Sequence, residues 1–159
     1  MSDRINFHLE DAIGFRQPGK GFVRQTIVKI ADSEKRALGD INIIFCSDEY
    51  LLCLNKTHLR HDYYTDVITF DYGFAKTISG DIFISIDRIN ENSKLYSQDF
   101  DVELIRVIIH GVLHLCGHGD KSLQEVKIMR SKEAKYLKLH LNSAKHVPRE
   151  TLPPINKKT

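Results

Sequence analysis

Residues 104–120, LIRVIIHGVLHLCGHGD, contain the pattern that decides the fold and places a candidate site in it. The first half is apolar around most of a helical circumference, which predicts a largely buried helix from about residue 99 to about residue 116. His110 and His114 lie four residues apart, so their imidazoles differ by only ~40° around the helix axis and share one face. Two unpaired imidazoles would be costly in a buried helix, and ligation of one metal ion would relieve that cost.

The residues after the second histidine supply a candidate third ligand. Gly117 tolerates a left-handed φ and can end the helix, and Gly119 loosens the next step, so the chain can return Asp120 toward the histidines. His118 is the alternative third ligand. The alternative without a metal is that the spacing of His110 and His114 arises by chance. Two nitrogens and one carboxylate with an open fourth position match catalytic zinc sites, in which the metal lowers the pKa of bound water to ~7.

The spacing H-x3-H-x2-G-x2-D is also that of the long zinc motif of metalloproteases. Gly111, however, stands where a protease carries its Glu general base, so a zinc peptidase is a disfavoured alternative. The H-x-E and P-C-x-x-C pattern of zinc deaminases is absent. The three cysteines form no CxxC pair, which speaks against a cysteine zinc site or a disulfide framework.

The periodicity of the remaining sequence indicates the fold class. Short apolar runs bounded by polar residues predict four strands, over residues 4–9, 40–46, 67–70 and 81–86. Helical spacing predicts helices over about residues 22–38, 48–54, 99–116 and 122–141. Gly39 is expected to stop the first of these and Ser47 to cap the second. The sequence thus predicts an α/β (α+β) single domain: a small mixed four-stranded sheet packed with about five helices, the metal site at the end of a buried helix.

Composition and charge narrow the class of protein. The chain has 159 residues, 42% hydrophobic and 28% charged, as expected for one ordered domain. No apolar run approaches the ~18 residues of a membrane span, and no secretion signal is recognisable, so a cytoplasmic protein is expected. Residues 1–120 carry 13 basic and 18 acidic side chains, net −5, whereas residues 121–159 carry 10 and 3, net +7. A basic end suits phosphate backbones, although a solubilising surface is the plain alternative. Residues 1–142 are expected to form the domain and residues 143–159 a basic, flexible tail.

The motif resembles the signature H-G-x-L-H-L-x-G-[YH]-D-H of the YbeY endoribonuclease family, which residues 110–118, HGVLHLCGH, follow closely. The resemblance covers roughly residues 40–135. Three further segments agree with the family in order and spacing: Leu54 and Asn55 with Arg60 leading to TDVITF at residues 65–70, Gly80-Asp81-Ile82, and the group Glu125, Met129 and Glu133.

The resemblance implies a cytoplasmic, single-strand-specific endoribonuclease that binds one zinc ion per chain through three residues. It also implies a role in maturation of the 3′ end of 16S rRNA and in ribosome quality control. The implied partner is rRNA of the small ribosomal subunit, and a ribosomal protein or a GTPase is a further candidate. No membrane association is implied, and the oligomeric state is left open. One departure stands out: the family has histidine at the third-ligand position, where this chain has Asp120, a residue that can also ligate zinc.

Specific roles can be assigned to several residues. His110, His114 and Asp120 are predicted to bind the metal, and Arg60 and His114 to be catalytic, with the Arg60 guanidinium gripping the scissile phosphate. Arg106 is expected to form an ion pair with Glu103. Asp81 is a candidate hydrogen-bond partner for a ligating imidazole. A functional alternative is a ribosome-associated RNA-binding module in which the zinc is structural.

Overall fold

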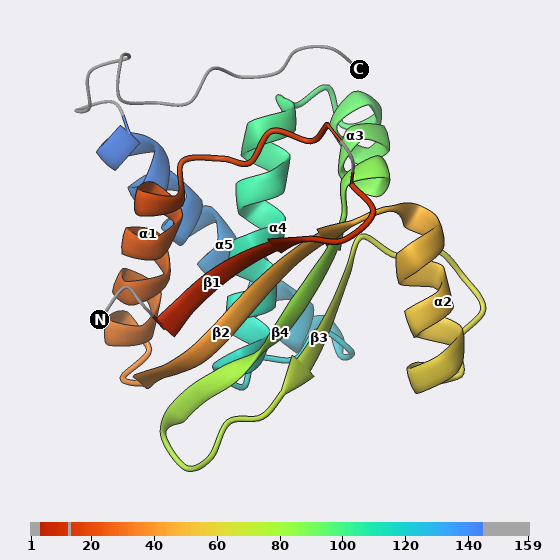
Figure 1. Ribbon diagram of the computed structural model, residues 1–159. Helices are drawn as coiled ribbons and strands as arrows, with labels where there is room; N and C mark the ends of the chain where they lie inside the picture. Colours follow the sequence, from red (N-terminus) through yellow and green to blue (C-terminus); the bar gives the residue numbers. More distant parts are fainter. Residues whose placement is uncertain (1–3, 13, 145–159) are drawn as a thin grey trace.

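Four strands form one mixed sheet in the computed structural model, which describes residues 4–12 and 14–144 (Figure 1). Within these residues the strands are β1 (Ile5–Leu9), β2 (Ala37–Cys46), β3 (Val67–Asp71) and β4 (Thr77–Ser85), arranged in the order β1-β2-β4-β3. β1 and β4 both pair parallel with β2, whereas β3 pairs antiparallel with β4. The predicted small mixed sheet of four strands is confirmed.

Five helices accompany the sheet in the described part of the chain, which confirms the predicted α/β class. They are α1 (Lys20–Ser33), α2 (Asp48–Leu59), α3 (Ile86–Leu95), α4 (Phe100–Leu115) and α5 (Leu123–Ala144). Of these described helices, none is long and apolar enough to cross a membrane.

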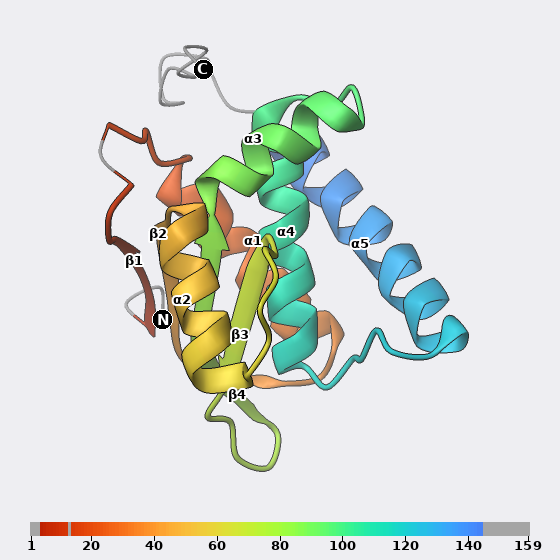
Figure 2. The ribbon, with the colours of Figure 1, turned by 90° about the vertical axis from the view of Figure 1, so that its right-hand side faces the viewer.

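Alternate residues of β4 face opposite sides of the sheet. Ile82 and Ile84 belong to the large core, to which α1, α4 and α5 contribute. Phe83 instead packs against a smaller cluster that includes Leu51 of α2 and Ile68 of β3. The sheet therefore lies between α2 on one face and α1 and α4 on the other, and α5 packs on the outside of α1 and α4 (Figure 2).

The central helix α4 is the element that positions the site. Its buried residues run almost continuously from Glu103 to Leu115, as the apolar sequence predicts. The helix ends because Gly117 adopts a left-handed φ of 101°, which lets the N–H groups of Gly117 and His118 donate to the carbonyls of His114 and Leu113. The chain then turns back along the helix end, carrying Asp120 with it.

The first helix is shorter than its pattern predicted. α1 ends at Ser33 because Lys35 takes a left-handed φ of 58° and the Arg36 N–H donates back to Ala31, which closes the helix. Leu38 and Gly39 belong to β2 instead, so the prediction that Gly39 stops the helix was wrong.

Two further differences concern β4 and α3. β4 begins at Thr77 because its first residues pair with Ala37 and Leu38 of β2, which the sequence had assigned to a helix. α3 was not located in advance because few apolar residues mark it; Ile89 and Ser93 are its buried residues. At the other end of the chain, α5 extends two residues beyond the predicted domain limit at 142, and residues 145–159 of the predicted tail lie outside the described residues.

Candidate metal centre

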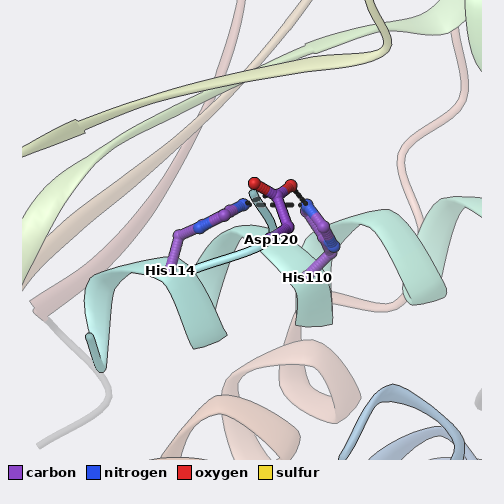
Figure 3. A group of neighbouring side chains, drawn as sticks. All are labelled: His110, His114 and Asp120. Carbon is purple, nitrogen blue, oxygen red and sulfur yellow. Dashed lines mark hydrogen bonds and ion pairs between the residues drawn. The ribbon is translucent and has the colours of Figure 1, made fainter. Parts of the chain in front are cut away.

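Three side chains converge at the C-terminal end of α4 (Figure 3). His110 and His114 project from the same face of the helix, and their Nε2 atoms lie 2.9 Å apart. Asp120 reaches them from the following turn, with Oδ2 3.4 Å from His110 Nε2 and 3.3 Å from His114 Nε2. Among the described residues, this is a group whose side chains can hold a metal ion.

Hydrogen bonds on the outer side of each ring fix which nitrogen faces the site. His110 Nδ1 donates to Glu133 Oε2 at 2.7 Å, and His114 Nδ1 donates to the carbonyl oxygen of His118 at 2.9 Å. A neutral imidazole carries only one N–H, so in their neutral forms both rings present a lone pair on Nε2 to Asp120. In these forms three acceptor atoms face one another, which is an arrangement that can hold a metal ion.

The spacing of these acceptors fits a small, four-coordinate ion. Ligand bonds of 2.0–2.1 Å in a tetrahedral zinc site separate neighbouring ligand atoms by about 3.3 Å. The two distances from Asp120 are 3.4 and 3.3 Å, and the distance between the imidazole nitrogens is somewhat shorter, at 2.9 Å. The donor set and its spacing are therefore suited to the predicted metal.

The electrostatic surroundings of His114 and Glu133 shift the pKa values of both side chains. Burial, together with the neighbouring His110, lowers the pKa of His114, which favours the neutral, ligating form. For Glu133, burial acts to raise the pKa, but the hydrogen bonds from His110 and Arg106 outweigh it and lower the pKa overall. Glu133 is thus an ionised acceptor that holds the His110 ring in place.

An ion-pair network supports Glu133 from behind. Arg106 Nη1 donates to Glu133 Oε1 at 2.9 Å, and the same guanidinium donates to both carboxylate oxygens of Glu103, at 2.6 and 3.1 Å. The predicted pair between Arg106 and Glu103 is confirmed. The hydrogen bonds that Arg106 donates to Glu103 outweigh burial and raise the pKa of Arg106, so the guanidinium stays charged inside the network.

The hydrogen-bond partner of His110 is Glu133, not the predicted Asp81. Asp81 accepts from the Asn42 side chain at 3.0 Å within the sheet, so its assignment as an imidazole partner was wrong. Sequence reasoning gave Glu133 no role, although a signal was present: it lies at helical spacing between the inward-facing Met129 and Tyr136, both buried. An acidic residue in such a stripe requires a buried partner.

The side chain of His118 points to a different partner. Its Nε2 lies 2.5 Å from Glu34 Oε1, at the end of α1, so its ring is engaged outside the metal group. The structure brings Asp120 rather than His118 to the two histidines. The backbone of His118 nevertheless belongs to the site, because its carbonyl orients His114.

Gly111 has a packing role that also excludes one class of enzyme. A Cβ atom at this position would lie 2.8 Å from Ile82 Cγ2, because α4 rests directly on β4 here. No side chain fits between helix and sheet, so the Glu base of the metalloproteases has no room. The packing therefore argues against the peptidase alternative independently of the missing residue.

Arg60 lies on another element, at the C-terminal end of α2, where it adopts a left-handed φ of 57°. Its side chain is exposed and has no hydrogen bond or ion pair with any residue in the described part of the chain. The loop that follows is fixed by the buried Asn55, which donates to the Tyr63 carbonyl at 2.8 Å. The guanidinium is therefore presented to solvent from an anchored turn.

Fold and site together define a small α/β protein with a histidine, histidine and carboxylate group that can hold a metal ion. The family model described as Endoribonuclease YbeY matches residues 12–140, and the chain belongs to this family. An endoribonuclease YbeY of Cytophaga hutchinsonii is 44% identical over 140 residues, covering 87% of this chain and 98% of the relative. One of Christiangramia forsetii is 47% identical over 116 residues, covering 73% and 81%.

A solved structure supports the same assignment. The solution structure of TM1509 from Thermotoga maritima superposes with a TM-score of 0.63 at 25% identity and covers 98% of this chain and 99% of that one. The family resemblance inferred from the sequence motif is thus confirmed by the family match, and the fold by this structural neighbour. The protein is accordingly a member of a family of nucleases, and nucleases are hydrolases.

Proposed function

We propose that this protein is a zinc-dependent, single-strand-specific endoribonuclease that acts in maturation of the 3′ end of 16S rRNA and in ribosome quality control. In this proposal one zinc ion per chain is held by His110, His114 and Asp120. The protein works in the cytoplasm on rRNA of the small ribosomal subunit, with a ribosomal protein or a GTPase as candidate partners. Membership of the YbeY family supports the endoribonuclease activity.

The observation that carries the proposal is the convergence of three acceptor atoms with fixed orientation. Both imidazoles have their Nδ1 atoms occupied by hydrogen bonds, so only Nε2 is available inside the site. Two imidazoles and one carboxylate are a ligand set of catalytic zinc sites, which keep the fourth position open for water or substrate. Structural zinc sites are closed by four protein ligands, commonly thiolates, and Cys116, the nearest cysteine in sequence, is buried in the core.

The chain's own groups bind the substrate and orient the site. A zinc ion held here supplies Lewis-acid stabilisation of a phosphoryl oxygen and makes water more acidic. The Arg60 guanidinium, which is free of ion pairs within the described residues, can bind a phosphate through two parallel hydrogen bonds and offset its charge. Glu133 and the His118 carbonyl hold the rings of His110 and His114 still, so both lone pairs stay directed into the site.

The outer face of α5 supports an RNA partner. The helix starts just beyond Asp120, and its two acidic residues, Glu125 and Glu133, are engaged in hydrogen bonds with Ser122 and with the metal-site residues. Its solvent-facing cations form no ion pair with the described part of the chain; they are Lys127, Arg130, Lys135 and Lys138. Such a face attracts the phosphate backbone without reading its sequence.

The decisive experiment combines metal quantification with RNA cleavage. Protein purified without chelators is analysed for transition metals and incubated with a precursor fragment spanning the 3′ end of 16S rRNA, alongside His114→Ala. The proposal requires stoichiometric zinc and cleavage in the wild type, with neither in the variant. A 2′,3′-cyclic phosphate among the products would identify the RNA 2′-hydroxyl as the nucleophile. A wild-type protein without stoichiometric metal would refute the zinc assignment.

The alternative function is a ribosome-associated RNA-binding module with a structural zinc. It is favoured by the same cationic face of α5 and by the absence of a base at Gly111. RNA affinity and melting temperature of His114→Ala separate the two. Loss of cleavage with both values retained excludes the module, whereas general unfolding of the variant favours it.

A further inference from the structure

The turn after α4 carries two groups that the metal site uses. The carbonyl of His118 accepts from His114 Nδ1, and Asp120 provides the carboxylate. Asp120 is 44% exposed and lies beyond the last backbone hydrogen bond that closes the helix, which His118 N–H donates to Leu113. Gly117 and Gly119 give this turn conformational freedom. A contact with a more distant part of the protein can restrict this freedom.

That contact is the side chain of His118 with Glu34. His118 Nε2 donates to Glu34 Oε1 at 2.5 Å, which joins the turn to the C-terminal end of α1. The other oxygen of Glu34 is held from α5, by Lys132 Nζ at 2.9 Å and by the Tyr136 hydroxyl at 2.5 Å. Residues 84 and more positions apart in sequence thus meet at a single carboxylate.

Glu34 is suited to be a fixed anchor. Its side chain is only 8% exposed, and although burial acts to raise its pKa, the hydrogen bonds from Tyr136, His118 and Lys132 lower the pKa to about 2. The carboxylate is ionised at neutral pH and accepts from three donors on two elements. Fully satisfied buried networks of this kind hold their members in one arrangement.

We propose that Glu34 is a positioning residue for the metal centre: by holding His118 it fixes the carbonyl that orients His114 and keeps Asp120 within reach of the ion. This inference rests on the proposed metal site and adds a residue from α1 to it. His118, the rival ligand in the sequence, acts on the metal through its backbone and its anchor and does not ligate the ion itself.

The test measures metal affinity and coordination geometry in matched variants of the full-length protein. Zinc dissociation constants come from competition with a chromophoric chelator, and the visible absorption of the Co²⁺-loaded protein reports the geometry around the ion. Glu34→Gln is compared with Asp48→Asn, whose carboxylate joins Ser85 and Arg88 by hydrogen bonds of 2.7 Å and does not contact the metal-site residues. Both variants lose a partly buried polar network, but only the first loosens the ligand-bearing turn.

We expect Glu34→Gln to weaken zinc binding about tenfold and to change the Co²⁺ spectrum, as for other groups that orient ligands. Asp48→Asn is expected to lower the melting temperature with zinc affinity and spectrum unchanged. His118→Ala should match Glu34→Gln, and His118→Gln should restore affinity because its amide can donate to Glu34. If Glu34→Gln does not fold, the comparison of His118→Ala with His118→Gln tests the role of the contact between His118 and Glu34.

The outcomes distinguish the inference from the proposal beneath it. A wild-type protein that binds no transition metal refutes the metal centre, and Glu34 positioning with it. A wild type that binds zinc, with Glu34→Gln at wild-type affinity or no weaker than Asp48→Asn, refutes only the role of Glu34. Complete loss of zinc in His118→Ala with full affinity in Glu34→Gln would make His118 a direct ligand.

Discussion

Replacing Glu133 by glutamine tests whether the network behind His110 serves the metal or only the fold. The glutamate accepts from His110 Nδ1 with one oxygen, at 2.7 Å, and from Arg106 with the other, at 2.9 Å. Glutamine has the same shape but only one acceptor oxygen. If the glutamine oxygen faces Arg106, its NH₂ group faces His110 Nδ1. The His110 proton must then move to Nε2, where it blocks ligation of the metal. If the glutamine oxygen faces His110, its NH₂ group meets the Arg106 guanidinium, and two donors face each other.

The size of the effect follows from this arrangement. Loss of a group that orients a ligating histidine weakens metal binding about 10–100-fold, which corresponds to about 1.4–2.7 kcal/mol. The unmatched donor in a buried network lowers the free energy of unfolding by about 1–3 kcal/mol as well. Glu103→Gln is the matched control, because Glu103 binds the same guanidinium, is 3% exposed, and does not touch a histidine.

The assay is zinc competition on both variants, with circular dichroism to establish that each is folded. Glu133→Gln and Glu103→Gln should lose similar stability, while zinc affinity falls only in Glu133→Gln. Equal zinc affinity in the two variants, whether reduced or retained, would show that Glu133 supports the fold alone.

Three further predictions concern Asp120 in the turn after α4, the packing of α4 on β4 at Gly111, and the buried His140. Asp120→His should retain zinc and shift the pH–rate profile of RNA cleavage to lower pH, because a neutral imidazole leaves the bound ion more positive; an unchanged or upward-shifted profile contradicts this. Gly111→Ala should lower the free energy of unfolding by about 1–3 kcal/mol, since its Cβ would meet Ile82 at 2.8 Å, and an unchanged chemical-denaturation curve speaks against it. Burial, together with the nearby Lys29, lowers the pKa of His140 in the folded protein below its usual value of 6.5. The unfolded chain therefore binds more protons, and the protein loses stability as the pH falls below 6.5. His140→Gln should flatten this pH dependence of the melting temperature, and equal slopes for the variant and the wild type would refute the prediction.

Local patterns determined the parts of the structure that the sequence could predict. His110 and His114 are brought together by helical geometry alone, and Gly117 ends the helix through its own backbone, so both could be recognised from spacing. Strand β2, which ends just before Ser47, and the class of the fold were predictable in the same way, from short apolar runs. The α3 helix was not, because only Ile89 and Ser93 are buried in it and the signal of a Ser85 cap is weak by itself.

Contacts between distant segments determined what could not be predicted. Glu34 and His118 are separated by 84 positions, and His110 and Glu133 by 23, so no local pattern reveals either pair. The end of α1 was misplaced for a related reason. Leu38 continues the apolar spacing of the helix, but pairing of β2 with β4 draws it into the sheet, a tertiary gain that outweighs helix propensity.

The proposed role of Asp120 as third ligand gives a physical reason for the proposed anchor of the turn. An aspartate carboxylate ends nearer to its own backbone than an imidazole Nε2 does, so the turn must approach α4 closely for Oδ2 to lie 3.3 Å from His114 Nε2. Gly119 removes a side chain that would meet the Glu125 carboxylate there, and Gly117 provides the left-handed φ that the reversal requires. In the absence of other contacts, both glycines also make the turn flexible. In the proposed metal centre, the Glu34 carboxylate, which accepts from Lys132 and Tyr136 of α5, restricts that freedom through His118, so the short side chain of Asp120 and the distant anchor act together.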